Sequence, residues 1–495
     1  MKTKKVIIPL AALALSLGSC KKSFFDINYN PNSPTESVVA PDLAIAPQMT
    51  SVAGINASTF DYLQRWLGYW SASGSYSPSS VEWSYNITND FGSGLWTSTY
   101  YIVGQLRSIQ AKSKALDWKF YEGMAKILEA HQMLTLVDAY GNAPYTEAFD
   151  LAKFIRPKYD NAEDIYKSIF ALVDEGMTLV KASNGNERNL ASRDIIFKGS
   201  ATNWCKFGNT LKLKMLLHTV KASTFNASTE IGKITAEGSG FLGSGLGAVV
   251  QPGYTPDKPN PYYNAHFFSI ANIENDNYNR ANDFSLSLMK SMNDDRYKKV
   301  YRPTKNDATK WQGTIYGSAA NDDFNSDKTS GPGRGITKDA TVPMWILSST
   351  EAMFLKAEAV LRGWIPGDAQ TAYNDAVKES FVSLEVPNAI TSAETYLQGV
   401  NPKVVWPASG TADEKMTVLM WQKYFGLNGI QANETWVDYR RLDLLTLPLS
   451  VYDQVGTRKI PVRLLYPTSE YSLNKENVEA QGTVDAQTTK LFWDK

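Results

Sequence analysis

Residues 348–377 read SSTEAMFLKAEAVLRGWIPGDAQTAYNDAV, and this stretch decides the fold class. Its first four residues, SSTE, form a capping box, which marks the start of a helix. The segment WIPG at 364–367 fits a short turn between two antiparallel helices. Residues on both sides of that turn match the small and aromatic positions of a tetratricopeptide repeat: Ala357, Ala369, Tyr373 and Ala376. The stretch therefore predicts a helical hairpin that needs neighbouring helices to bury its face.

Three further stretches carry apolar residues at helical spacing, over 120–134, 165–180 and 204–218. The segment GNAP at 141–144 ends the first of these helices, and a second capping box, TADE, begins another at residue 411. Strand-like alternation is scarce. We therefore predict a mainly α protein with one domain over residues 41–495, in which tetratricopeptide-type helix pairs carry long irregular loops. Helices near 118–139 and 161–181 are candidates for further pairs.

The first twenty residues are typical of a secreted bacterial lipoprotein. A basic start precedes an apolar stretch over 6–17, which is shorter than the about 20 residues that a spanning helix needs. Leu17-Gly18-Ser19-Cys20 resembles a lipobox, so we predict a signal peptide over 1–19, lipidation of Cys20 and a polar tether over 20–40. An ordinary signal peptide cut near Ser19 is the alternative. No later stretch is apolar enough to span a membrane, so the lipid is the predicted anchor.

Composition excludes several classes of protein. Fifty basic residues balance fifty acidic ones, and no Lys/Arg-rich block is present, so we expect no nucleic-acid partner. With Cys20 assigned to lipid, Cys205 is left alone and a disulfide framework is excluded. Because Cys205 stands beside Trp204 in an apolar helical pattern, we predict that it is a buried small hydrophobe.

Polar, irregular stretches lie between the predicted helices, over 71–94, 183–202, 221–285, 302–345 and 382–411. Loops of that length are usually functional or mobile. Aromatic residues gather in two of these regions: Trp70, Tyr76, Trp83 and Tyr85, then Tyr262, Tyr263, Tyr278, Trp311 and Tyr316. Sugar rings stack on such planes, with about 0.5–1.5 kcal/mol per ring beyond area burial, by analogy with aromatic pairs. All but Tyr262 are our predicted ligand contacts, and Trp83 is favoured because its own segment offers no apolar bed.

Six elements in order then carry a family resemblance. They are DIN at 26–28 with NPNSP at 30–34, LW and YY at 95–101, WCKFGN at 204–209, NDDR at 293–296, ETWVDYRR at 434–441, and IPVRLLYP at 460–467 followed by Glu470. Together they resemble the SusD/RagB family of lipoproteins, and more narrowly its nutrient-binding SusD-like branch. Asp295 stands where the family usually has proline.

The resemblance implies a tetratricopeptide-containing α fold and a lipoprotein on the outer face of the outer membrane. It also implies a partner, a TonB-dependent outer-membrane β-barrel that this protein would cap as a lid while capturing an oligosaccharide or peptide ligand. Lys21-Lys22 departs from the acidic export signal that often follows the lipidated cysteine in the family. Outward orientation is thus a weaker expectation than lipidation.

Other motifs are given structural interpretations. Trp436, Asp438, Arg440 and Arg441 are expected to be an aromatic anchor with ion pairs at a helix start, and Arg463 and Glu470 are interpreted likewise. The GSGFLG segment at 238–243 matches a dinucleotide motif, but further glycines and Pro252 follow it, so a flexible loop is predicted.

Catalytic and metal motifs lead to no assignment. Asp323, Asn325 and Asp327 begin like a calcium loop, yet Lys328 and Arg334 exclude an EF-hand and leave only a looser calcium site open. H-E-x-x-H, G-x-S-x-G and C-x-x-C are absent. We therefore predict no cofactor and no catalytic residue. A lipid-anchored glycoside hydrolase stays the alternative, because two carboxylates can meet from anywhere in a chain.

Overall fold

The computed structural model describes residues 39–77, 79–271, 273–453 and 458–494. The chain divides into Met1–Ala40 and Pro41–Lys495. The predicted signal peptide, Cys20 and the tether up to residue 38 lie outside the described residues. Within the second unit the mainly α prediction is confirmed, since helices dominate and the few strands are short.

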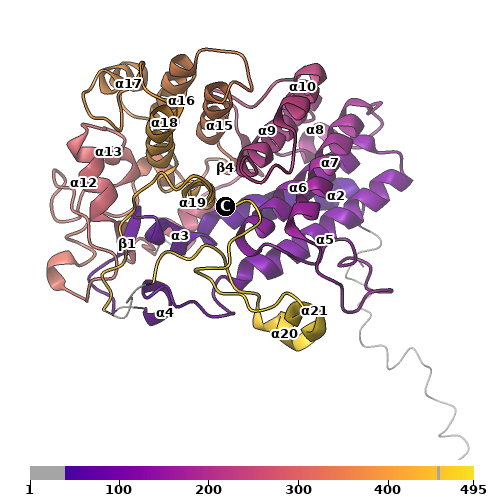
Figure 1. Cartoon of the computed structure of the whole chain (residues 1–495), viewed down its shortest axis with the longest axis horizontal. Coiled ribbons are helices and arrows are strands. Elements are labelled where there is room, and N and C mark those ends of the chain that lie inside the picture. The colour runs from indigo at the N-terminus through magenta and orange to yellow at the C-terminus, as the bar shows by residue number, and fades with distance from the viewer. Residues whose placement is uncertain (1–38, 78, 272, 454–457, 495) are drawn as a thin grey trace, which may run out of the picture. The chain divides into compact units, whose positions relative to one another are not determined.

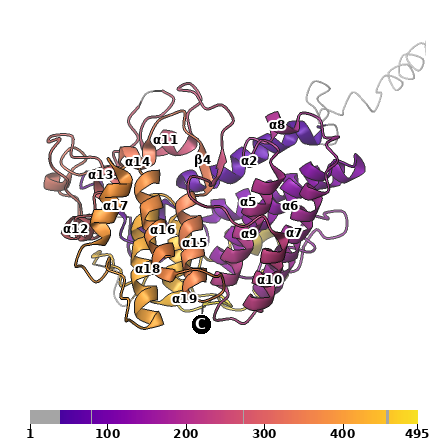
Figure 2. The ribbon, with the colours of Figure 1, turned by 90° about the horizontal axis from the view of Figure 1, so that it is seen from above.

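One group of helices comes from the first half of this unit (Figures 1 and 2). It consists of α2 (Pro41–Ser58), α5 (Ser93–Ala115), α6 (Lys119–Tyr140), α7 (Ala162–Lys181), α9 (Ala201–His218) and α10 (Ala227–Glu237). Glycines allow the close approach of α6 and α7, because a Cβ on Gly123 would lie 2.5 Å from the carbonyl oxygen of Gly176. The helices predicted near 118–139 and 161–181 therefore form a pair.

The hairpin predicted from residues 348–377 is present as α15 (Ser349–Leu361) and α16 (Ala369–Ser383), which pack side by side (Figure 2). Ser348 caps α15 by accepting the amide of Glu351, as expected. Ala357, Tyr373 and Ala376 are at most 1% exposed. Three more helices adjoin this pair: α17 (Ala389–Leu397), α18 (Ala412–Leu427) and α19 (Ala432–Leu442). Assignment of the pair to the tetratricopeptide class stays a prediction.

The expectation of irregular structure is wrong at 227–237 and 389–397, where α10 and α17 form, and short elements occupy other parts of the stretches between the long helices. Strand β1 (Trp70–Ala72) pairs antiparallel with β3 (Asn279–Ala281), and β2 (Ala248–Val250) with β4 (Met344–Leu347). The short helices are α3 (Asp61–Trp66), α4 (Ser80–Trp83), α8 (Leu190–Arg193), α11 (Pro261–His266), α12 (Asp283–Ser291), α13 (Tyr297–Val300), η3 (Asp322–Phe324), α14 (Arg334–Thr337), α20 (Thr468–Leu473) and α21 (Lys475–Glu479). Apart from the nine-residue α12, these elements have three to six residues and are too short to leave a periodic pattern.

A buried network of charged side chains connects the helices. Its members are Asp138 of α6, Lys214 and His218 of α9, Glu351 and Glu358 of α15, Lys423 of α18, and Glu434, Asp438 and Arg441 of α19. Glu434 lies at its centre and contacts Lys214 at 2.9 Å and Lys423 at 2.7 Å. Removal of one partner from a buried pair leaves an uncompensated charge and typically costs about 3–5 kcal/mol.

The segment 434–441 plays the structural role that its sequence predicts. The indole nitrogen of Trp436 donates to the carbonyl oxygen of Pro461 at 2.9 Å, and the guanidinium of Arg440 stacks 3.6 Å from the Trp436 ring centroid. Arg441 pairs with Asp438 at 2.6 Å. Arg463 donates to the carbonyl of Tyr140, and Glu470 accepts from the hydroxyl of Tyr159 at 2.8 Å. These residues join the C-terminal segment to α6, α19 and the loop that follows α6.

Within the described part of the chain, no helix combines the length and apolar character that crossing a bilayer requires.

Candidate ligand-binding site

Three loops that are far apart in the sequence meet through their backbones. The amide of Gly74 donates to the carbonyl of Phe324 at 2.8 Å, and the amide of Asn321 returns a bond to Gly74 at 2.9 Å. The amide of Ser73 donates to the carbonyl of Tyr278 at 2.8 Å. A Cβ on Gly74 would lie 2.2 Å from the carbonyl oxygen of Asn321, so this close approach requires glycine. The two aromatic regions of the sequence are thereby brought together.

Aromatic side chains gather where these loops meet. The rings of Tyr76 and Tyr278 contact each other edge to face, with centroids 5.0 Å apart. Trp311 and Phe324 line one hollow of about 340 Å³, together with Ile315. Tyr76 is 39% exposed, Phe324 37% and Ile315 54%, which leaves apolar surface open to a ligand. We call the surface formed by Tyr76, Tyr278, Trp311, Ile315 and Phe324 the loop face.

Arg65 of α3 packs against the ring of Tyr278. Its guanidinium lies 5.3 Å from the Tyr278 ring centroid and donates to Asn279 at 2.7 Å. It also pairs with Glu82 of α4 through two contacts of 2.5 and 2.7 Å. Burial by itself lowers the pKa of Arg65, but the adjacent carboxylate of Glu82 outweighs it and the pKa is raised. The permanent cation therefore fixes β3 and α4 around Tyr278.

Trp311 is held by one hydrogen bond and one ring contact. The indole nitrogen donates to the carbonyl of Tyr301 at 3.0 Å, and the ring meets Tyr297 edge to face at 5.5 Å. The side chain is half-buried, so part of the ring faces the hollow that it shares with Phe324. Such a ring, with its hydrogen bond already made, is suited to stacking against the apolar face of a sugar.

Polar side chains lie between the aromatic ones. Ser326 bridges two loops, because its hydroxyl donates to the carbonyl of Asn277 at 2.9 Å and lies 3.0 Å from the hydroxyl of Ser73. The side-chain amide of Gln312 donates to the carbonyl of Asp323 at 3.2 Å. Ser75 and Asp323 are exposed at this surface. Hydroxyl, amide and carboxylate groups of this kind can bind the hydroxyls of a sugar.

The acidic residues of the loops surround an ammonium group. Lys305 pairs with Glu274, and its Nζ lies 3.9 Å from a carboxylate oxygen of Asp276 and 3.9 Å from one of Asp327. Asn277 accepts from the same Nζ at 3.2 Å. Among the described residues no group of three or more His, Cys, Asp or Glu side chains could hold a metal ion. The looser calcium site left open by the sequence therefore has no support, and Lys305 supplies the local cation.

Four predicted ligand residues are buried. Trp70 is 1% exposed, Trp83 2%, Tyr85 1% and Tyr316 3%. The expectation that Trp83 is exposed is wrong, because Tyr316 and Tyr452 supply the apolar bed that its own segment lacks, with ring centroids 5.9 and 6.4 Å away. These buried rings offer no face to a ligand in this structure, and we assign them no contact.

Tyr263 is half-buried on α11, away from the loop face. Its ring lies under the guanidinium of Arg334, 5.9 Å from the centroid, and meets Phe267 edge to face. The neighbouring Tyr262 is buried. Of the predicted ligand residues, Tyr76, Tyr278 and Trp311 therefore lie on the loop face. Phe324 and Ile315 were missed, although Phe324 stands in a polar segment like the one that drew attention to Trp83.

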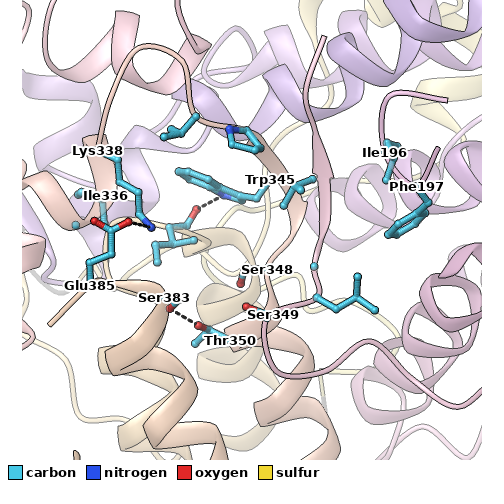
Figure 3. A pocket seen from close by; sticks show the side chains of 18 of the residues that line it. Ile196, Phe197, Ile336, Lys338, Trp345, Ser348, Ser349, Thr350, Ser383 and Glu385 are labelled. Carbon is cyan, nitrogen blue, oxygen red and sulfur yellow. Dashed lines mark hydrogen bonds and ion pairs between the residues drawn. The ribbon is translucent and has the colours of Figure 1, made fainter. Parts of the chain in front are cut away.

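A larger cavity of about 670 Å³ lies elsewhere, where β4 meets the start of α15 (Figure 3). Trp345 stands at its centre. Lys338 and Glu385 lie on one side of this ring, and Ile196 and Phe197 lie on the other. No pattern in the sequence predicts this cavity, because its walls come from five separate stretches, over 196–203, 245–249, 335–350, 383–385 and residue 430.

Two further predictions from the sequence are testable here. The glycines of 238–243 follow helix α10 and precede strand β2, so the strand-turn-helix order of a dinucleotide site is absent at this segment. Cys205 is fully buried, as predicted, and burial raises the pKa of its thiol to about 11. A buried thiol of that kind is a poor nucleophile.

Similar proteins share this architecture. A SusD homolog from Bacteroides uniformis has a TM-score of 0.75 at 22% identity, over 91% of this chain and 99% of that one. A chitin-binding SusD homolog from Flavobacterium johnsoniae has a TM-score of 0.74 at 22% identity, over 92% and 98%. A SusD/RagB family protein from Bacteroides thetaiotaomicron has a TM-score of 0.72 at 21% identity, over 92% and 99%. At such identity the likeness shows the fold.

A search of curated proteins found no match. The family model described as "Starch-binding associating with outer membrane" matches residues 31–467. The match covers most of the chain, including all of the loop face and the cavity around Trp345. The chain therefore belongs to the SusD-like family.

Proposed function

We propose that this protein is a non-catalytic surface lipoprotein that captures an oligosaccharide on the loop face and acts as the lid of a TonB-dependent outer-membrane transporter. The observation that carries the binding role is the meeting of two sequence-distant aromatic regions at one surface, with Tyr76, Tyr278, Trp311 and Phe324 beside hydroxyl and amide groups. The family description and the chitin-binding relative support a glycan as the ligand.

A binding role also agrees with the state of the carboxylates at this surface. Glu274 and Asp327 lie against the ammonium group of Lys305, and Asp323 pairs with Lys328 at 3.5 Å. A glycosidase of the usual kind needs two carboxyl groups that flank the scissile bond, one of them kept protonated. Carboxylates that pair with lysines are better suited to holding loops in place than to donating a proton to a glycosidic bond.

Substitution of the exposed rings tests the loop face. After a glycan array has identified a ligand, calorimetric titration compares Tyr76→Ala and Trp311→Ala with the unmodified protein. Loss of a stacked ring worth about 0.5–1.5 kcal/mol weakens binding by roughly 2- to 12-fold. Tyr471→Ala, at a 36% exposed tyrosine on α20, is the matched control and keeps full affinity. Unchanged affinity in both loop-face variants would place the ligand elsewhere.

The transporter and the alternative enzyme are tested separately. We expect a β-barrel transporter to co-purify with the full chain from outer membranes, and we expect no new reducing ends when the protein is incubated with its glycan. Turnover that disappears on substitution of one Asp or Glu would instead establish a hydrolase. Co-purification without glycan binding would retain the lid role and reject the capture role.

A further inference from the structure

The cavity around Trp345 is separate from the loop face, and none of its lining residues belongs to that surface. Its volume of about 670 Å³ is within the range of small-molecule sites, which is about 300–1,000 Å³. Figure 3 shows Trp345 projecting between the Lys338–Glu385 pair and the Ile196–Phe197 wall. A ligand bound between these two walls would therefore contact the indole ring.

The indole ring contacts the ring of Tyr262, with centroids 4.9 Å apart, and its remaining surface lines the cavity. Its nitrogen donates to the carbonyl of Ile430 at 3.1 Å, so the polar end of the ring is already satisfied. The ring itself is half-buried. Apolar side chains form the walls around it: Ile196, Phe197, Val249, Ile336, Val342 and Ile430. These walls favour a ligand with a flat, apolar body.

Polar side chains gather at the start of α15 on one side of the cavity, and Lys198 and Asn203 line it beside the Ile196–Phe197 wall. The hydroxyls of Thr350 and Ser383 lie 2.8 Å apart, and the half-buried Ser349 is beside them at the first position of α15. Lys338 pairs with Glu385 at 2.9 Å at one end. A ligand's hydrogen-bonding groups are therefore best placed on the edge that meets the start of α15. A sugar carries hydroxyls around its whole ring, and the apolar walls would leave several of them unpaired.

The rim of the cavity is built from strained backbone. Lys198, Lys338 and Glu385 have φ values of 57°, 23° and 57°, which side-chain-bearing residues rarely adopt. Such residues cluster at ligand clamps, where the surrounding structure holds them. Three residues with such backbone conformations around one cavity support a preformed ligand site.

We propose that this cavity binds a small planar aromatic molecule that carries a hydroxyl or carbonyl group on one edge. The aromatic body stacks on Trp345 between the apolar walls, and the polar edge faces the half-buried Ser349 and Ser383. This binding is independent of the loop face and of the oligosaccharide proposed there.

Filling the cavity tests the assignment. The probe is 7-hydroxycoumarin, titrated calorimetrically into the purified full chain. Ser349→Trp places a large ring inside the cavity and is expected to weaken binding at least ten-fold. Thr468→Trp is the control, because Thr468 is exposed at the first position of α20 and lies outside the cavity. It is expected to bind the probe like the unmodified protein.

A second cavity-filling variant keeps the test valid if Ser349→Trp does not fold. Val342→Trp enters the cavity from its apolar wall, and thermal melting identifies whichever variant remains folded. Absence of binding to the unmodified protein, or full binding by both folded variants, would overturn the proposal. Loss of oligosaccharide binding in these variants would also overturn it, since the cavity would then hold sugar. Tyr76→Ala is expected to bind 7-hydroxycoumarin normally, which separates this site from the loop face.

Discussion

At the residue scale, burial decides what each aromatic side chain can do, and Trp83 and Tyr76 illustrate the contrast. Trp83 is 2% exposed and packs against Tyr316 and Tyr452, whereas Tyr76 is 39% exposed. Trp83→Ala should leave a cavity and lower the free energy of unfolding by about 3–5 kcal/mol. Tyr76→Ala should melt like the unmodified protein. Chemical denaturation of both variants measures this difference, and an unchanged stability of Trp83→Ala would show that the ring is not part of the core.

The sequence could not have separated these two residues. Both stand in the same Ser- and Asn-rich segment, and what distinguishes them is contact with residues more than 200 positions away. Tyr278 and Trp311 also stand in polar loops and are half-buried, so the polar context alone did not decide which aromatic side chains stay accessible. Their meeting with Tyr76 depends on backbone hydrogen bonds of Ser73 and Gly74, which no periodicity encodes.

At the scale of elements, the packing of α15 against α16 leaves no room for a larger side chain at Ala376, which is fully buried. Ala376→Trp should force the two helices apart and destabilise the protein by at least about 1–3 kcal/mol, the usual range for overpacking. Asp375→Trp is the matched control, because Asp375 is exposed one position earlier on the same helix. Thermal melting should lower the midpoint of the first variant alone. Equal midpoints would contradict the helix pairing.

Long helices such as α6 and α7 were predictable, because several turns of apolar spacing leave a clear pattern, whereas α2 and α10 were not predicted. Capping residues located the starts of α15 and α18 as well. Elements such as β1, α4 and η3 were missed, since three or four residues cannot show a period. The loop face is built on these short elements, so the sequence located its regions without locating its geometry.

At the scale of the whole molecule, the buried charged network links stability to pH through His218. Burial by itself lowers the pKa of His218, but the carboxylates of Asp138 and Glu434, each 3.1 Å away, together raise it above 6.5. A raised pKa in the folded state stabilises the protein below the unfolded value of about 6.5, and this stabilisation is lost as pH rises through the folded pKa. Stability should therefore decline above about pH 6.5.

Chemical denaturation at a series of pH values measures the free energy of unfolding of the unmodified protein and of His218→Gln. The decline in stability above about pH 6.5 that His218 causes should be missing in the variant. His131 is the internal contrast, because burial lowers its pKa to about 3. The stability that neutral His131 contributes is present above about pH 6.5 and is lost as pH falls towards 3. The free energy of unfolding of His131→Gln should therefore fall less over this acidic range. Identical pH profiles for His218→Gln and the unmodified protein would mean that His218 is not charged in the fold.

The predicted membrane attachment rests on Cys20, which lies outside the described residues, and the second cysteine of the chain, Cys205, allows a matched test. If the lipobox prediction is right, Cys20 carries acyl chains, and cells grown with an alkyne-bearing fatty acid should label the protein. Cys20→Ala should abolish the label. Cys205→Ala should keep it, because Cys205 is fully buried and its pKa of about 11 leaves the thiol protonated. An ordinary signal peptide cut near Ser19 would instead leave the unmodified protein unlabelled, and the proposed lid would then need its barrel partner as its only hold on the membrane.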